Sequence, residues 1–228
     1  MSRLQTLVLA LACAASAAAA PALASDDIVR TNGAVTTEPG ANYGRLATTN
    51  GSIRLADGVT AGEASTTNGS IAAGSGVTSD GLSTVNGSIR VGERARIAGD
   101  VRTVNGSVLV GRGSRVGGDV ASVNGALGVI ATEVGGDMRI ANGDLTVGVD
   151  SHVRGGVHVA KPSANWMPIR VSTRRQRVVI GPRAVVDGPL VFEREVVLYV
   201  HDSARIGPVT GAEPVRFSTP TAPTRDED

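Results

Sequence analysis

Three aspartates recur at a nearly fixed spacing, and they are the residues in this sequence best suited to chemistry. Asp100, Asp119 and Asp137 each follow a glycine, at intervals of 19 and 18 residues. If a repeating fold stacks them, their carboxylates form a column, and carboxylate oxygens are ligands of calcium. The glycine-rich nonapeptide of calcium-binding repeats is absent. The sequence therefore predicts no metal site and favours carboxylates that each accept a backbone N–H at their own corner.

Three histidines are the other candidates for catalysis. His152, His158 and His201 are scattered along the chain. Hexapeptide acyltransferases use one histidine on an 18-residue coil, but six-residue spacing fails here because Ile89 and Ile97 are eight residues apart. Enzymes that cleave polysaccharides on a β-helix need an aromatic-lined cleft, which 2 tyrosines and 1 tryptophan cannot line. The sequence predicts no enzymatic activity and no cofactor.

A repeat of 18 or 19 residues positions all these side chains. Asn-Gly returns from Asn32 to Asn142 at this interval, and aliphatic residues two apart, such as Ile89 and Val91, follow it. Such pairs are typical of short strands, and a fixed short period is typical of a solenoid. Aromatic residues make up only 2%, which suits thin, regular layers. We predict an all-β chain folded as a single-stranded parallel β-helix with 18–20 residues in each coil.

Each Asn-Gly is predicted to form one corner of a coil, where Asn tolerates a left-handed backbone and Gly adopts it freely. Stacked Asn amides can then hydrogen-bond from coil to coil. The predicted turn ladder comprises Asn50, Asn68, Asn86, Asn105, Asn124 and Asn142. Hydroxyl residues flank it in two further columns, Thr48, Thr66, Thr84 and Thr103, and Ser52, Ser70, Ser88 and Ser107. Two outward hydroxyl columns could order ice-like water; the alternative is an ordinary solvated face.

The unit "I-x-V-G-x-x-A-x-I-x-G-D-V", from Ile89 to Val101, resembles the repeat of bactofilins, the polymer-forming cytoskeletal proteins of bacteria. "VVIGPRAVVDGPL" and "LYVHDSARIGPV", which begin at Val178 and Leu198, resemble the same unit. The resemblance runs from about residue 89 to residue 209 and implies a right-handed β-helix whose ends stack. "TVNGSI", from Thr84 to Ile89, resembles repeats of exported adhesin-like proteins.

The N-terminal segment has the composition of a secretory signal. Arg3 precedes an apolar run, and "ALA" precedes Ser25, so cleavage after Ala24 is expected, with export to the periplasm. The alternative is a lipoprotein anchored through Cys13. No later apolar run is long enough for a transmembrane helix. The predicted division is 1–24 signal peptide, 25–159 β-helix repeats, 160–177 insertion loop, 178–217 further coils and a C-terminal cap, and 218–228 disordered tail.

The insertion loop contains the only tryptophan and a group of arginines. The candidate binding residues are Trp166, Arg170, Arg174, Arg175 and Arg177. They suit an anionic envelope polymer or lipid headgroups, whereas the alternative is an indole packed on the rod among solvated arginines. The net charge of +1 gives no reason to expect nucleic acid as a partner.

The sequence therefore predicts an exported structural or adhesin-like protein of the cell envelope. A binding module that uses the insertion is the alternative function. Self-association is predicted at the N-terminal coil, which enters the repeat at once, with only Asp26 and Asp27 opposing it. The C-terminal end is blunted by Pro208, Pro214 and Phe217, which continue a strand ladder poorly.

Overall fold

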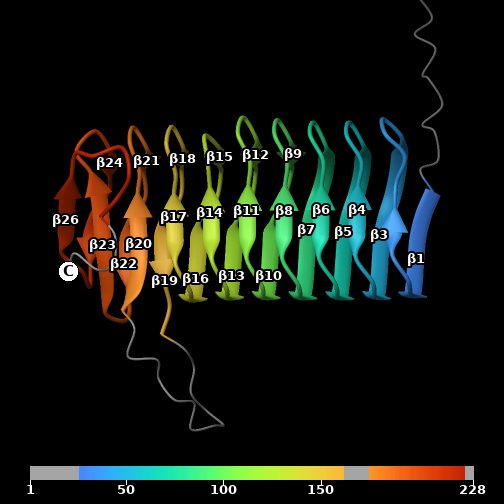
Figure 1. The fold of residues 1–228 in the computed structure, drawn as a ribbon, viewed down its shortest axis with the longest axis horizontal. Helices are drawn as coiled ribbons and strands as arrows, with labels where there is room; N and C mark the ends of the chain where they lie inside the picture. Colours follow the sequence, from blue (N-terminus) through green and yellow to red (C-terminus); the bar gives the residue numbers. More distant parts are fainter. Residues whose placement is uncertain (1–25, 162–174, 224–228) are drawn as a thin grey trace, which may run out of the picture.

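The computed structural model describes residues 26–161 and 175–223, and the predicted signal peptide lies outside these ranges. The described residues form strands and no helix, and every paired strand is parallel to its neighbour. Figure 1 shows the coils stacked side by side in sequence order, from the blue N-terminal end of a rod to its red C-terminal end. The prediction of an all-β parallel solenoid is confirmed.

One sheet contains a single strand from each of ten turns. Its strands are β2 (Val35–Thr36), β4 (Ile53–Leu55), β6 (Ile71–Ala73), β8 (Ile89–Val91), β11 (Val108–Val110), β14 (Leu127–Val129), β17 (Leu145–Val147), β20 (Gln176–Ile180), β23 (Val196–His201) and β26 (Pro214–Phe217). The first seven, from β2 to β17, are the strands that the sequence marks after each Asn-Gly. The predicted insertion loop ends earlier than expected, because β20 already begins at Gln176.

The second sheet has 16 strands and covers the other two sides of the coil. Its first strands are long: β1 (Asp26–Asn32), β3 (Asn42–Asn50), β5 (Thr60–Asn68) and β7 (Thr78–Asn86). Beyond β7 each long strand is replaced by two short ones. The first series is β9 (Arg96–Ile97), β12 (Arg115–Val116), β15 (Glu133–Val134), β18 (His152–Val153), β21 (Val185–Val186) and β24 (Arg205–Ile206). The second series is β10 (Val101–Asn105), β13 (Val120–Asn124), β16 (Met138–Asn142), β19 (Val157–Val159), β22 (Leu190–Phe192) and β25 (Val209–Thr210).

One inserted residue explains why the long strands split. The register aligns Ser79 with Ile97 and Leu82 with Val101. The corner between them consists of two residues, 80–81, in one coil and of three residues, 98–100, in the next. The added residue lengthens the repeat from 18 to 19. It also creates the glycine–aspartate corner on which Asp100 and the later aspartates lie.

The core is one continuous cluster of aliphatic side chains that point into the coils. Ile89, Val91 and Ile97 are at most 2% exposed, and Val101 is fully buried. Alternate residues of each strand point inward, as the spacing of two predicts. Each such side chain contributes roughly 1.5–3 kcal/mol when buried, and the narrow interior explains why so few aromatic residues are used.

The glycines of the Asn-Gly corners at Gly51, Gly87 and Gly106 are required by close contact between coils and not by backbone conformation. A β-carbon on Gly87 would lie 2.1 Å from the carbonyl oxygen of Gly69, and the same contact recurs at Gly51 and Gly106. None of these three glycines has a left-handed φ, and no ladder Asn in the described chain does. The predicted left-handed corner is therefore wrong for these positions. Only a hydrogen atom fits between the stacked backbones.

Candidate functional site

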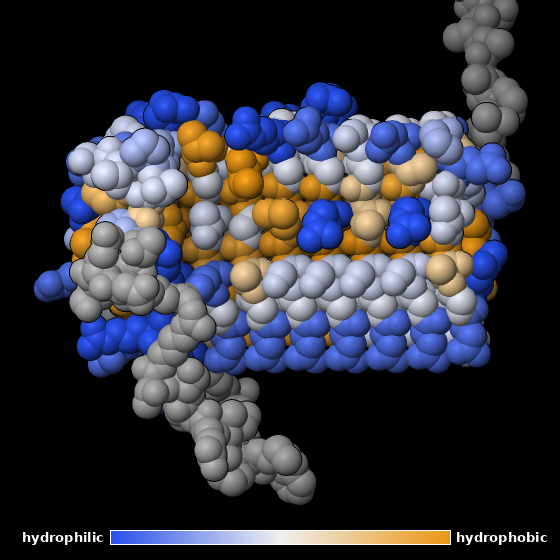
Figure 2. Space-filling view, viewed as in Figure 1, coloured by the Kyte–Doolittle hydropathy of each residue, from blue (hydrophilic) through white to orange (hydrophobic). Residues whose placement is uncertain are grey.

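A ladder of asparagine amides runs along one edge of the rod. The ladder residues are the last residues of β1, β3, β5, β7, β10, β13 and β16. The Nδ2 of each Asn donates to the Oδ1 of the Asn one coil earlier, over 2.9–3.0 Å. Figure 2 shows the resulting hydrophilic row along the edge where these strands of Figure 1 end. The predicted ladder is confirmed and includes Asn32. Arg194 ends it, because its Nη1 donates to the Oδ1 of Asn142 over 2.9 Å.

The threonine column points inward, so the prediction of two outward hydroxyl columns is wrong. Thr66 and Thr84 are about as buried as core residues, at 5% and 4% exposure. The hydroxyl of Thr84 donates to the carbonyl of Gly69 over 2.8 Å, and Thr103 repeats this bond to Gly87. The serine column is exposed at Ser52, Ser70 and Ser88 and half-buried at Ser107. Its oxygens accept N–H groups of the next coil over 3.1–3.3 Å. Both columns hold the coils together.

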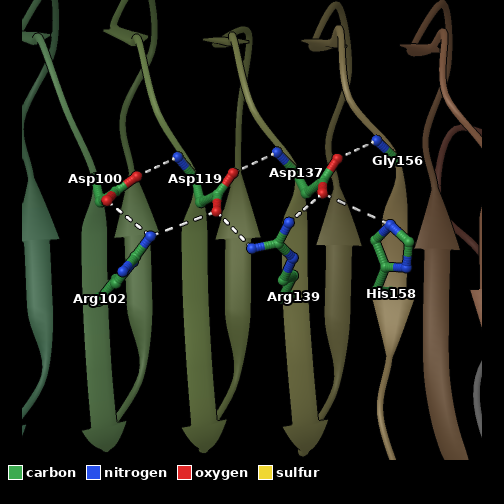
Figure 3. A network of polar contacts seen from close by, with 7 residues as sticks. All are labelled: Asp100, Arg102, Asp119, Asp137, Arg139, Gly156 and His158. Carbon is green, nitrogen blue, oxygen red and sulfur yellow. Dashed lines mark hydrogen bonds and ion pairs between the residues drawn. The ribbon is translucent and has the colours of Figure 1, made fainter.

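The three aspartates form a second ladder, drawn in Figure 3. The Oδ1 of Asp100 accepts the backbone N–H of Asp119 over 2.7 Å, and Asp119 accepts that of Asp137 over 2.9 Å. The backbone N–H of Gly156 donates to Asp137 over 2.7 Å and ends the series. Each carboxylate therefore binds the following coil, and the expected bond at its own corner is wrong. Gly118, Gly136 and Gly155 provide the room for these bonds, because a β-carbon on any of them would lie 2.3 Å from the Oδ1 of the aspartate one coil earlier.

Two arginines lie between the carboxylates and balance their charge. Arg102 contacts Asp100 at 2.7 Å and Asp119 at 3.5 Å, while Arg139 contacts Asp119 at 2.6 Å and Asp137 at 2.5 Å. The imidazole of His158 lies 3.7 Å from Asp137. Cations and anions thus alternate along the rod (Figure 3). Within the described ranges, no group of three or more His, Cys, Asp or Glu residues is placed to hold a metal ion.

The electrostatics of Asp137 give this ladder a pH dependence. Burial raises the pKa of Asp137. The hydrogen bonds from Gly156 and Arg139 lower this pKa by more than burial raises it, so that the pKa of Asp137 lies below the ordinary 3.8. Because the pKa of Asp137 is lower in the folded than in the unfolded protein, ionised Asp137 stabilises the fold at any pH above its unfolded-state pKa. This stabilisation is lost as the pH falls through the lower pKa of the folded state.

We therefore expect the urea midpoint of the wild-type protein to fall as pH is lowered below 3.8, the ordinary pKa of aspartate. The Asp137→Asn variant lacks the titrating group, so its midpoint should depend less on pH over that interval. Equal pH dependence of the two proteins would contradict the role given to this carboxylate.

An apolar groove of about 480 Å³ lies beside the aspartate ladder. Val85, Val104 and Val123 occupy one outward position on successive coils and are 39–44% exposed. Arg102 and Arg139 flank them on the same face. This stripe is one of the few exposed apolar features of the described rod. Its cations are already paired, so the groove has no excess of positive charge.

The strand edges at the two ends of the rod differ. Among the described residues, β1 and β2 each pair with one strand only. Val29 of β1 is 68% exposed, and the carboxylate of Asp27 accepts the N–H of Arg45 over 2.6 Å, so it faces the next coil. Arg30 is in register with the buried Thr48, and its Nη1 donates to the carbonyl of Ala34 over 2.8 Å. Arg30 is thus a charge at an inward position of the first coil.

The C-terminal end contains residues that extend a ladder poorly. β26 begins at Pro214, which has no N–H to donate. Phe217 is 7% exposed and packs edge-on against His201, with ring centroids 5.0 Å apart. Arg177, from the coil before β23, donates to the carbonyl of Pro223. These contacts fix the end of the described chain against the side of the rod.

Of the five predicted binding residues, the structure describes only Arg175 and Arg177. Trp166, Arg170 and Arg174 lie outside the described residues. Arg175 is exposed, with its Nε 3.9 Å from Glu195. Arg177 lies in β20, where its guanidinium is 5.0 Å from the centre of the Tyr199 ring. Arg177 therefore has a packing role beside its hydrogen bond to the chain end.

The histidines lie on different strands. His152 in β18 contacts Asp187 at 2.6 Å, and His158 is in β19. His201 closes a local turn in which the N–H of Ser203 donates to its Nδ1 over 3.1 Å. No described helix is long and apolar enough to span a membrane.

The fold defines this chain as a parallel β-solenoid protein whose coils are held by side-chain ladders. Compared with models of protein families, with curated proteins and with solved structures, the chain matches none of them. The resemblance to bactofilins and adhesin-like repeats consequently rests on the repeat unit alone.

Proposed function

We propose that this protein is an exported structural or adhesin-like rod of the cell envelope that associates with a second copy through its N-terminal coil. The observation that carries the proposal is the pair of strand edges on β1 and β2, which have no neighbour on their outer side among the described residues. Unpaired strand edges are templates for pairing with another chain. Export is supported by the composition of the N-terminal segment. The bactofilin-like repeat unit is compatible with end-to-end association.

The rod is suited to a mechanical or scaffolding role. Asparagine, serine, threonine and aspartate side chains each bond one coil to the next, and they do so at several corners of the same coil. We propose a non-enzymatic role because the described polar clusters are engaged in these ladders. Their hydrogen bonds are internal to the rod and leave its outer faces for contact with partners.

The two ends favour a dimer over a filament. Pro214 and Phe217 make the C-terminal end a poor continuation of the ladder, so N-terminal coils would meet head to head. In that arrangement Arg30 of each copy lies near the contact. A charge at an inward edge position weakens strand addition. We therefore propose that Arg30 limits the strength of the association.

Replacing Thr36 by proline tests this interface directly. The N–H groups of Val35 and Thr37 donate to Ser52 and Arg54 of the second coil, so the N–H of Thr36 points to the unpaired edge, because successive residues alternate in direction. We expect Thr36→Pro to remove one edge donor, leave the inner bonds in place, and weaken dimerisation at least roughly tenfold in sedimentation equilibrium.

Thr36→Ala is the matched control, since it shortens the same side chain and keeps the N–H. It should dimerise as the wild type does. Circular dichroism should show the same β content in all three proteins. A wild-type protein that stays monomeric at the highest soluble concentration would refute the proposed association, as would a Thr36→Pro variant that dimerises normally.

A further inference from the structure

Five arginines gather on two neighbouring coils, away from both ends of the rod and from the predicted insertion. They are Arg90, Arg94, Arg96, Arg112 and Arg115, and all are exposed. Arg96 of β9 is in register with Arg115 of β12. The backbone N–H of Arg94 donates to the carbonyl of Arg112 over 2.8 Å. Arg94, Arg96, Arg112 and Arg115 therefore lie around one corner of the two coils, and Arg90 precedes them on β8.

Three of these arginines line a polar surface groove of about 640 Å³. Arg94, Arg96 and Arg115 surround Gly113, whose missing side chain leaves the floor open. A β-carbon on Gly113 would lie 3.4 Å from Cγ of Arg94, so the arginine stem passes over the glycine. Because the lining residues come from successive coils, the groove follows the axis of the rod.

The acids in the groove are neutralised by neighbouring cations. Glu133 is paired with Arg115 and Arg154, and the hydrogen bond from Arg115 is the main cause of its lowered pKa. Asp150 accepts two hydrogen bonds from Arg183, over 2.6 and 2.7 Å, which lower its pKa.

The arginines at the other end of the groove are not balanced in this way. Arg96 has no ion-pair partner within the described ranges, and Arg94 has only an exposed contact with Glu93 at 3.4 Å. The N-terminal half of the groove is therefore positive.

Arg94 lies at a turn position that the coils fill with a left-handed residue. Its φ is 54°, and the neighbouring coils have Gly76 and Gly113 there, with φ of 67° and 70°. Ala131, Asp150 and Arg183 occupy the same position in later coils with φ of 44–55°. The turn therefore accepts residues with and without a β-carbon. Arg115 is engaged by Glu133, whereas Arg96, in register with it on the adjacent strand, is not. A bound anion would supply the missing partner of Arg96.

We infer that this groove binds the carboxylate or phosphate groups of a linear anionic glycan. Guanidinium groups bind both anions through paired hydrogen bonds. Gly76, Ser114 and Thr132 line the groove without any large apolar side chain that could anchor it in a bilayer. A hydrophilic polymer laid along the axis would pass Arg96 and then Arg115, one coil apart. The site is independent of the proposed N-terminal association.

The test uses oligogalacturonate, a carboxylated linear glycan, titrated into the full-length chain by calorimetry. Arg94→Gly/Arg96→Thr copies Gly76 and Thr78 of the preceding coil, so it should fold. We expect it to bind roughly tenfold more weakly than the wild type. Arg54→Ala/Arg205→Thr removes the same charge at outward positions elsewhere and should stay within about twofold of the wild type.

Four further arms test whether the arginine groove itself binds the glycan. Neutral dextran should not bind. Arg174→Gln/Arg175→Gln should bind oligogalacturonate normally; loss of binding in this variant alone would place the site on the insertion and overturn the inference. Equal weakening by both charge-matched pairs would reduce the effect to net charge and also overturn it. Binding to phosphatidylglycerol vesicles or duplex DNA with none to oligogalacturonate would contradict the choice of ligand.

Discussion

Replacing Gly87 by alanine is expected to destabilise the rod by roughly 3 kcal/mol, the upper range for overpacking. The new β-carbon would lie 2.1 Å from the carbonyl oxygen of Gly69 and 2.9 Å from the backbone N of Ser70. Neither atom belongs to a flexible side chain, so two stacked coils must separate locally. The hydroxyl of Thr103, which donates to the carbonyl of Gly87, would lose its geometry as well. Urea unfolding followed by circular dichroism measures the loss.

Gly128→Ala is the matched control for this prediction. Gly128 lies at an outward position of β14, and a β-carbon there would meet only Cδ1 of Leu109, at 3.4 Å. We expect a change within about 0.5 kcal/mol, or a slight stabilisation from lower entropy of the unfolded chain. If the two glycines tolerate alanine equally well, the stacked corner is not as tight as described.

Replacing Asp119 by alanine is expected to be the most damaging change in the charged ladder. It removes the acceptor of the Asp137 N–H and leaves Arg139 with one carboxylate instead of two. Because a backbone donor loses its partner at a largely buried position, we expect a loss of about 2 kcal/mol. The shift of the urea midpoint at neutral pH checks this value.

Asp119→Asn separates the two roles of this side chain. It keeps an oxygen for the Asp137 N–H and removes only the charge that faces Arg102 and Arg139. Exposed ion pairs are weak, so the loss should be about 1 kcal/mol or less. If asparagine were as damaging as alanine, the ion pairs and not the backbone bond would dominate the ladder.

The fold could be predicted because the coils of a solenoid repeat at a fixed interval that is visible in the sequence. The Asn-Gly interval sets the coil, and pairs such as Ile89 and Val91 mark the strand in each turn. The inward direction of the threonines is also present in the sequence: Thr84 lies two residues after the buried Leu82, so the strand period places both on one face. The neighbouring column of exposed Asn residues obscures that signal.

Other features depend on which atoms meet between coils. The need for glycine at Gly87 comes from the position of a carbonyl one coil away, and no local preference of Asn-Gly reveals it. The same holds for Asp100, whose carboxylate bonds to the next coil's backbone. The arginine groove is hidden in the sequence because Arg94 and Arg115 are far apart along the chain and meet only when coils stack. Arg30 resembles an ordinary strand residue until its register with Thr48 is known.

Electron microscopy of the protein from residue 25 onward, with a gold label at the C-terminus, tests the central claim most directly. A single rod of ten turns should be about 45–50 Å long at the spacing of paired strands. We predict rods of twice this length, with one label at each outer end. They should become more frequent in Arg30→Thr, which places at this position the residue that Thr48 provides in the next coil. Single rods at every concentration, labels at the junction, or long filaments would contradict association through the N-terminal coil.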